Sequence, residues 1–166
     1  MKQSSATYNA RLLASLLKKH GCTNIVVAPG SRNAPLIMAL SVDEEYQTWS
    51  VPDERAAAFT ALGMAFENGR PAAVICTSGS AAANFLPAVT EAFYQKTPLI
   101  VITADRPREL TGQGAGQTID QENIYGRHVL AEANLLRDPA DDLAREFNQR
   151  KLNEALLTAP QGPVHI

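Results

Sequence analysis

The chain has 166 residues, enough to bury a sizeable core in a single domain, and 45% of them are apolar. Its 15 basic and 17 acidic residues leave a net charge of −2, so electrostatics favour neither nucleic acid nor an anionic membrane as a partner. No apolar run reaches the roughly 20 residues of a membrane span, and the N-terminal "MKQSSATYNARLL" lacks the apolar segment of a signal peptide. We therefore expect a cytoplasmic protein.

Helical and strand-like segments alternate from the N-terminus onward. Residues 7–20 place leucines on one face at helical spacing, and the apolar run 24–28 is typical of a buried parallel strand. Pro35 suits the first turn of a second helix, and a strand-like segment follows at 46–51. The alanine-rich segment 53–69 predicts a strong helix that begins on acidic residues and ends at a glycine.

The alternation continues through the middle of the chain and then stops. An apolar strand at 72–78 precedes a helix at 80–95, in which Pro87 predicts a kink or break. The segment 98–104 is the fourth strong strand. Residues 105–127 then form a loop rich in glycine and glutamine, and loops of this length are usually functional or disordered.

The last part of the chain contains a weaker strand at 128–135, a long helix after Pro139 and the apolar ending "GPVHI". Alternating elements with apolar strands predict an α/β fold, a three-layer, doubly wound parallel sheet with helices on both faces. The chain stops at Ile166 inside an apparent core strand, without a polar tail. We therefore expect residues 1–166 to be a single domain cut from a longer polypeptide.

Polar or small residues follow four of the predicted strands, in "APGSR", "VPDER", "CTSGSAAAN" and "TADRP". Ligands of doubly wound sheets bind beyond the carboxyl ends of the strands. Glu54 is either an ordinary acid stabilised by the helix dipole or a carboxylate in a crevice, where burial would raise its pKa. The segment around Gly79 also has two interpretations. Either Ser78 or Ser80 simply caps the helix, or Gly79 lets backbone amides at the helix start approach a ligand closely.

Two arginines lie at the same predicted edge of the sheet. Arg32 and Arg106 can each be ordinary solvated side chains, or together they can clamp a carboxylate. Gln117 would add an amide donor if the long loop folds back over the site. The sequence contains no dinucleotide-binding motif, P-loop, nucleophile elbow or metal-binding histidine pattern. We interpret the three histidines as structural or surface residues and Cys76 as a core residue.

With these motifs in view, the chain resembles the N-terminal, pyrimidine-binding domain of thiamine-diphosphate-dependent enzymes. The segments "DERAAAFTALGMA" and "VICTSGSAAANFLPAVTEA" match turns shared across that superfamily. The segments "APGSRNAPL", "ITADRPREL" and "GAGQTI" are narrower, and they are similar to a family of menaquinone-biosynthesis synthases. Asn33 and Ala34 stand where some members of that family carry serine or threonine.

The resemblance implies a transferase that decarboxylates 2-oxoglutarate and adds the succinyl unit to isochorismate. Thiamine diphosphate would carry the carbanion chemistry, with Mg²⁺ or Mn²⁺ as the metal. Glu54 would activate the cofactor through its aminopyrimidine ring. The other implied cofactor contacts are Pro29, Thr77, Ser78 and Gly79. The implied isochorismate-binding residues are Ser31, Arg32, Arg106 and Gln117.

The resemblance also implies that the site is incomplete within this chain. In the superfamily, a C-terminal domain holds the diphosphate and the metal through a G-D-G motif that is absent here, and a partner subunit completes the site. We therefore expect an inactive domain of a homo-oligomer. The small residues of helices 53–69 and 80–95 would form the subunit interface or remain as the largest exposed apolar patch. Two alternatives stay open: another carboligase, similar to acetolactate synthase, and a non-catalytic binding or assembly module of the same fold.

Overall fold

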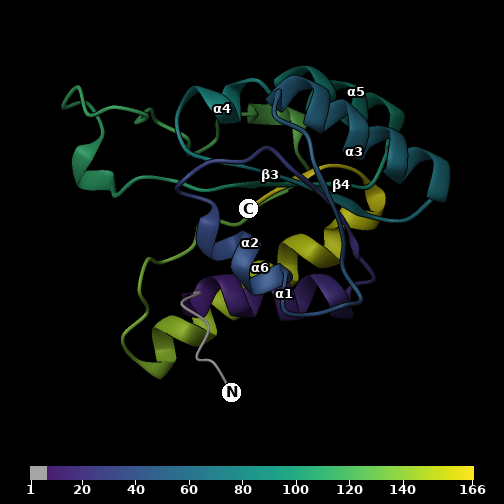
Figure 1. Ribbon diagram of the computed structural model, residues 1–166. Coiled ribbons are helices and arrows are strands. Elements are labelled where there is room, and N and C mark those ends of the chain that lie inside the picture. The colour runs from purple at the N-terminus through teal and green to yellow at the C-terminus, as the bar shows by residue number, and fades with distance from the viewer. Residues whose placement is uncertain (1–6) are drawn as a thin grey trace.

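The computed structural model describes residues 7–166 (Figure 1). It contains a six-stranded sheet in which every strand pair is parallel. The strands are β1 (Asn24–Val27), β2 (Gln47–Ser50), β3 (Ala72–Cys76), β4 (Leu99–Thr103), β5 (Ala131–Glu132) and β6 (Val164–His165). Their order across the sheet is β2-β1-β3-β4-β6-β5. The start of the segment considered for a signal peptide, residues 1–6, lies outside the described residues.

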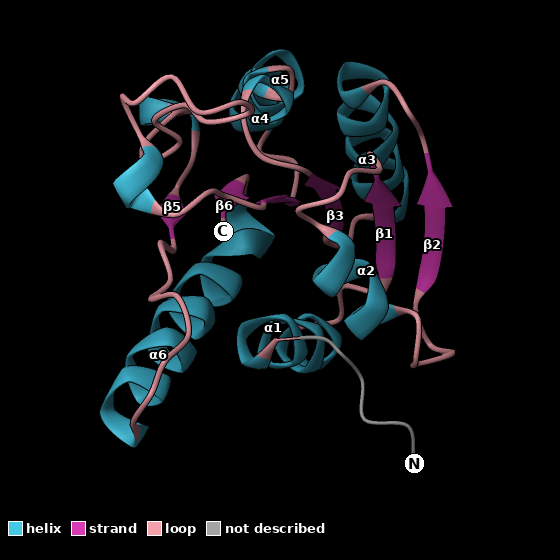
Figure 2. Cartoon of the chain, turned by 60° about the vertical axis from the view of Figure 1, so that its left-hand side comes forward, coloured by secondary structure: helices cyan, strands magenta, loops and turns pink. Residues whose placement is uncertain are grey.

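Helices cover both faces of the sheet (Figure 2). On one face lie α1 (Tyr8–Lys19), α2 (Ala34–Leu40) and α6 (Asp142–Thr158), and on the other lie α3 (Glu54–Asn68), α4 (Ser80–Ala83) and α5 (Leu86–Gln95). Short 3₁₀ turns occur at η1 (Arg108–Leu110), η2 (Gly126–His128) and η3 (Ala159–Gln161). The predicted α/β class and doubly wound parallel sheet are confirmed.

Two apolar cores fill the spaces between the sheet and its helices. Ile25 and Val27 of β1 pack on the side of α1, α2 and α6, whereas Val26 packs on the side of α3 and α5. All five residues of β3 are buried, as are the first four residues of β4. Because fully burying one Val or Ile contributes roughly 1.5–3 kcal/mol, these central strands anchor the fold.

Side-chain caps fix where three of the longer helices begin. Thr7, Asp53 and Asp141 each accept a hydrogen bond from the backbone amide three residues later, at the starts of α1, α3 and α6. Each such cap contributes about 1 kcal/mol. The cap on Asp53 matters most for the site, because it places Glu54 in the first turn of α3.

The structure confirms the expected break in the helix near Pro87, and it contains a shorter strand than expected at residues 128–135. The predicted helix 80–95 is broken, and Pro87 lies in the first turn of the second piece, α5, where its missing amide costs nothing. The predicted strand 128–135 is reduced to the two residues of β5. Along residues 7–166, none of the helices combines the length and apolar character needed to cross a membrane.

The prediction that the alanines of α3 and α4 form a subunit interface is wrong for most of them. Six are buried in the domain's own core, where their small side chains let the helices lie close to the sheet: Ala57, Ala58, Ala61, Ala65, Ala81 and Ala82. The same helical layer exposes larger apolar side chains instead, namely Phe59, Phe66, Leu86 and Tyr94. Assembly through this layer stays a prediction.

The turns that follow β1 and β3 touch each other. The amide of Ala28 donates to the carbonyl of Ile75 at 2.8 Å, which extends the pairing of the two strands. At Gly30, an added Cβ would lie only 2.4 Å from Cβ of Thr77. Only glycine therefore allows the two turns to approach this closely.

We predict that Gly30→Ala destabilises the protein because the new methyl group must displace the side chain or backbone of Thr77. Overpacking of this kind lowers the free energy of unfolding by about 1–3 kcal/mol. Gly63→Ala is the matched control, since a Cβ at this exposed helical position meets nothing within 4 Å. It should raise the free energy of unfolding by up to about 1 kcal/mol. Urea denaturation measures both changes, and equal effects at the two positions would contradict the contact.

Candidate functional site

The carboxyl ends of β1, β3 and β4 lie at one edge of the sheet and carry most of the predicted site residues. From β1 the chain continues to β2 at one edge strand of the sheet, whereas from β3 it continues to β4 in the opposite direction across the sheet. The winding therefore reverses between β1 and β3. This switch point is where doubly wound sheets bind ligands. Because β3 lies between β1 and β4, the turns after those two strands begin about 10 Å apart.

Glu54 lies half-buried in the first turn of α3, and its carboxylate has no hydrogen bond or ion pair among residues 7–166. Burial raises the pKa of the Cys76 thiol far above its usual range, and the negative charge of Glu54 raises it further. The carboxylate therefore lies near the end of β3. Cys76 is fully buried, as predicted for a core residue.

The turn after β3 is buried and held by the long loop. Ser78 Oγ donates to the carbonyl of Gln117 at 2.9 Å, and the amide of Gly79 donates to Oε1 of Gln121 at 2.8 Å. Gly79 has a φ of +83°, which side chains rarely adopt, and no side chain caps α4. The simple helix-cap interpretation of the serines is therefore wrong, and two groups expected to face a ligand are already engaged within the chain.

Two buried polar atoms beside the switch point have no hydrogen-bond partner among the described residues: Oγ1 of Thr77 and Oδ1 of Asn33. Thr77 is the residue that contacts Gly30, and Nδ2 of Asn33 donates to the carbonyl of Ala28 at 2.8 Å. Leaving one such group unsatisfied costs roughly 1–3 kcal/mol. Unpaired groups of this kind fit a site whose ligand supplies the missing hydrogen bonds.

The loop at residues 105–127 folds back over this edge of the sheet, which is the condition that the prediction for Gln117 required. Gln117 itself is exposed and has a φ of +53°. Arg106 Nη1 donates to the carbonyl of Gly116 at 3.3 Å, while its buried Nε has no partner among the described residues. Arg106 and Gln117 thus lie close together through Gly116.

Pro29, Ser31 and Arg32 follow β1 and are all exposed. Within the described part of the chain, the side chains of Ser31 and Arg32 make no hydrogen bond or ion pair, so both are accessible to a ligand. No direct contact joins Arg32 to Arg106. The two arginines lie on opposite sides of the turn after β3, because β1 and β4 flank that strand.

Sequence reasoning missed a polar cluster at the ends of β4, β5 and β6. His165 is only 4% exposed, and its Nε2 lies 2.8 Å from Oγ1 of Thr103. Its Nδ1 lies 3.3 Å from Oε1 of Glu132, although without the alignment of a hydrogen bond. The ring of Tyr125 packs edge-on against the imidazole at 4.7 Å. His165 is therefore structural and buried; a histidine inside the apolar ending "GPVHI" was the available signal.

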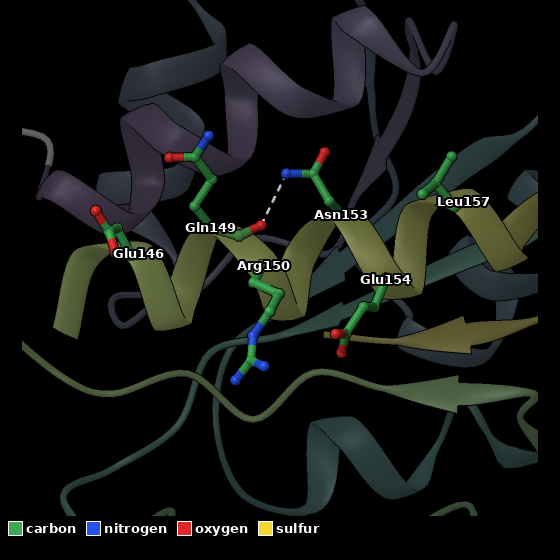
Figure 3. A pocket seen from close by; sticks show the side chains of 6 residues that line it. All are labelled: Glu146, Gln149, Arg150, Asn153, Glu154 and Leu157. Atoms are coloured by element: carbon green, nitrogen blue, oxygen red, sulfur yellow. Dashed lines mark hydrogen bonds between the residues drawn. The ribbon is translucent and has the colours of Figure 1, made fainter. Parts of the chain in front are cut away.

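Two hollows on the surface of the described residues lie away from this edge of the sheet. One of about 540 Å³ runs along the outer face of α6, where Arg150, Asn153 and Glu154 are among its lining residues (Figure 3). Another of about 530 Å³ lies at the opposite, amino-terminal edge of β1 and β2, beside Trp49 and Arg70. Neither contains a predicted site residue. Among residues 7–166, no group of three or more His, Cys, Asp or Glu side chains is arranged to hold a metal ion.

Comparison with known proteins shows the family of the chain. The family described as "Thiamine pyrophosphate enzyme, N-terminal TPP binding domain" matches residues 9–124. A 2-succinyl-5-enolpyruvyl-6-hydroxy-3-cyclohexene-1-carboxylate synthase from Flavobacterium johnsoniae is 46% identical over 159 residues, which cover 95% of this chain and 28% of that protein. The synthase of the same name from Geobacillus kaustophilus is 45% identical over 170 residues, covering 100% of this chain and 29% of that protein.

A solved structure shares the fold at low sequence identity. The thiamine diphosphate-dependent 4-hydroxybenzoylformate decarboxylase of Rhodococcus jostii RHA1 superposes with a TM-score of 0.76 at 23% identity, over 96% of this chain and 29% of that chain. The chain therefore spans less than a third of the length of the relatives that it matches.

We predict that Glu132 makes stability fall in acid. Burial alone would raise the pKa of Glu132, but the His165 imidazole and the Asn123 amide outweigh that effect and hold the pKa below its usual range. Its contribution is present above the unfolded value near 4.3 and is lost as the pH falls through the lower folded value. Glu132→Gln should therefore flatten the loss of urea resistance between about pH 5 and pH 3. An unchanged slope would contradict the assignment.

Proposed function

This chain belongs to the thiamine pyrophosphate enzymes as an N-terminal TPP binding domain, and from this premise we propose that it supplies part of the active site of a menaquinone-biosynthesis synthase. The proposed reaction decarboxylates 2-oxoglutarate and transfers the succinyl unit to isochorismate. The names of the relatives that align with nearly the whole chain support this activity.

We infer that residues 1–166 form the pyrimidine-binding domain of a longer enzyme. The relatives are more than three times as long, and the described residues offer no metal-binding cluster for a diphosphate-bound Mg²⁺ or Mn²⁺. Those functions would fall to further domains and to a partner subunit of a cytoplasmic homo-oligomer. On this proposal the chain is inactive by itself.

The residues at the switch point fit the aminopyrimidine part of the cofactor. Thiamine diphosphate, when bound, supplies the carbanion chemistry. The chain supplies the carboxylate of Glu54, which lacks a partner among the described residues and can hold a proton at a ring nitrogen. Thr77 offers an unpaired hydroxyl, and Pro29, Ser78 and Gly79 shape the two turns around it.

The second substrate would lie across the turn after β3. Ser31 and Arg32 stand on one side of that turn, and Arg106 and Gln117 stand on the other. Two guanidinium groups whose strands are about 10 Å apart suit an acid with more than one carboxylate, because each can form charge-assisted hydrogen bonds.

The observation that carries the proposal is the pair of groups at the reversal of the winding that have no partner among the described residues: the carboxylate of Glu54, whose charge acts on Cys76 at the end of β3, and the buried hydroxyl of Thr77, the next residue after Cys76. An acetolactate-synthase-like carboligase would need the glutamate but not the two arginines. Calorimetric titration of the complete enzyme with isochorismate and with pyruvate separates these two activities. A non-catalytic module would bind neither substrate productively.

In the complete enzyme that carries this sequence, we expect Glu54→Gln to slow cofactor activation by roughly two or more orders of magnitude. The amide keeps the size of the side chain but cannot accept the proton. Exchange of the C2 proton of the thiazolium with deuterium, followed by NMR, measures activation directly. Glu67→Gln, at the exposed far end of α3, is the matched control and should leave exchange unchanged. Normal exchange in Glu54→Gln would refute the role.

Arg106→Ala should raise the KM for isochorismate about 10- to 100-fold and spare decarboxylation of 2-oxoglutarate. The reason is the loss of a charged hydrogen-bond partner, which costs about 1.5–3 kcal/mol. Arg127→Ala, at an exposed position at the far end of the loop, serves as the control. Steady-state kinetics of both half-reactions provide the measurement. Equal losses in the two would instead assign Arg106 to structure, through its bond to Gly116.

A further inference from the structure

Gln121 joins three segments of the candidate site through one side chain. It is only 3% exposed, and both ends of its amide are engaged. Its Oε1 accepts from the amide of Gly79 at 2.8 Å, and its Nε2 donates to the carbonyl of Ala104 at 3.2 Å. Gly79 follows β3 and Ala104 follows β4, so the loop is tied to the ends of both strands.

The two partners require an amide at this position. The Gly79 amide can only donate and the Ala104 carbonyl can only accept, so the side chain must offer one acceptor and one donor. A hydrocarbon satisfies neither group, and an ionised carboxylate satisfies only Gly79. The orientation of the Gln121 amide is therefore determined by its surroundings.

The bond to Gly79 also determines where Gln117 lies. The backbone of Gln117 packs against Gly79, where an added Cβ would meet its Cα and carbonyl carbon at 3.0 Å. On the same turn, Ser78 Oγ donates to the Gln117 carbonyl. Residues 117–121 thus wrap around Gly79, with the backbone of Gln117 on one side and the amide of Gln121 bonded to its N–H.

We propose that Gln121 is a positioning residue that sets the location of Gln117 and Arg106 relative to the turn after β3, and so sets the affinity for the acidic second substrate. This inference rests on the proposed function. Gln121 reaches Arg106 through Ala104, two residues earlier, and it reaches Gln117 through Gly79. It makes no hydrogen bond to Glu54, so cofactor activation is independent of it.

The loop keeps other anchors when Gln121 is replaced. Tyr125 is buried and donates to the carbonyl of Ala82 at 2.7 Å, and the Asn123 amide donates to Glu132 at 2.8 Å. Variants at position 121 should therefore fold with a displaced loop.

The first test compares Gln121→Met with Gln113→Met in the complete enzyme. Gln113 belongs to the same loop but is exposed and bonds only the nearby carbonyl of Glu109, which makes it a matched control. Gln121→Met should raise the KM for isochorismate at least tenfold and leave C2-proton exchange within twofold of the parent, whereas Gln113→Met should change neither. A merely structural role would raise the KM and slow C2-proton exchange together, or would change neither, and either result would overturn the proposal.

The second test uses Gln121→Glu, because a protonated carboxyl offers one donor and one acceptor, as the amide does. Burial raises the pKa of the introduced carboxyl. The KM for isochorismate should therefore be near normal at low pH and rise, relative to the parent, as the pH increases through that pKa. The titratable and charged side chains around this position are Asp105, Arg106, Arg108, Asp120, Glu122 and His165. All of them are shared with the parent and with Gln121→Met. A constant ratio to the parent across pH would overturn the proposal.

A third measurement separates this inference from the proposed function. Amide hydrogen exchange of peptides covering 105–121, without any substrate, should be faster in Gln121→Met than in Gln113→Met. If Glu54→Gln exchanges the C2 proton normally, the proposed chemistry fails, yet this comparison still decides whether Gln121 positions the loop. Equal exchange in the two methionine variants would refute the positioning role alone.

Discussion

The close approach of the turn after β1 to the turn after β3 is the constraint on which the site depends. Glycine at position 30 lets the backbone lie against Thr77 at a distance that no Cβ would allow. The parallel pairing of β1 with β3 brings the two turns to the same edge, and the reversal of winding at that point leaves no strand connection above them. Glu54, Asn33 and the long loop are all arranged around this contact.

The site contains two kinds of polar groups. Those already hydrogen-bonded hold the turn after β3 in place, and those without a partner are available to a ligand. Ser78 Oγ and the Gly79 amide are bonded to the loop, so they hold the turn in place. Thr77 Oγ1, Asn33 Oδ1 and Arg106 Nε are buried without partners among the described residues. Because an unsatisfied buried group costs stability, such groups mark positions where a ligand gains most by binding.

Much of the fold was predictable because its signals are local. The apolar run of β3, the cap at Asp53 and the proline that opens α5 each act over a few residues. The alanines of α3 were misinterpreted because small size indicates close packing but not against which surface. Ala61 and its neighbours pack against the domain's own sheet, and the periodicity of the sequence is the same in either case.

The sequence by itself determined the order of elements, the identity of the strand-end turns and the residue types in them, since these follow from periodicity and turn chemistry. Only the tertiary structure decided that Gln121 reaches Gly79 across 42 residues and that His165 reaches Thr103 across 62. Such contacts depend on which strands become neighbours in the sheet. They also depend on which part of the sheet a loop without a periodic pattern packs against. No local propensity specifies either, because the free energy that selects them comes from packing and hydrogen bonding in the assembled sheet.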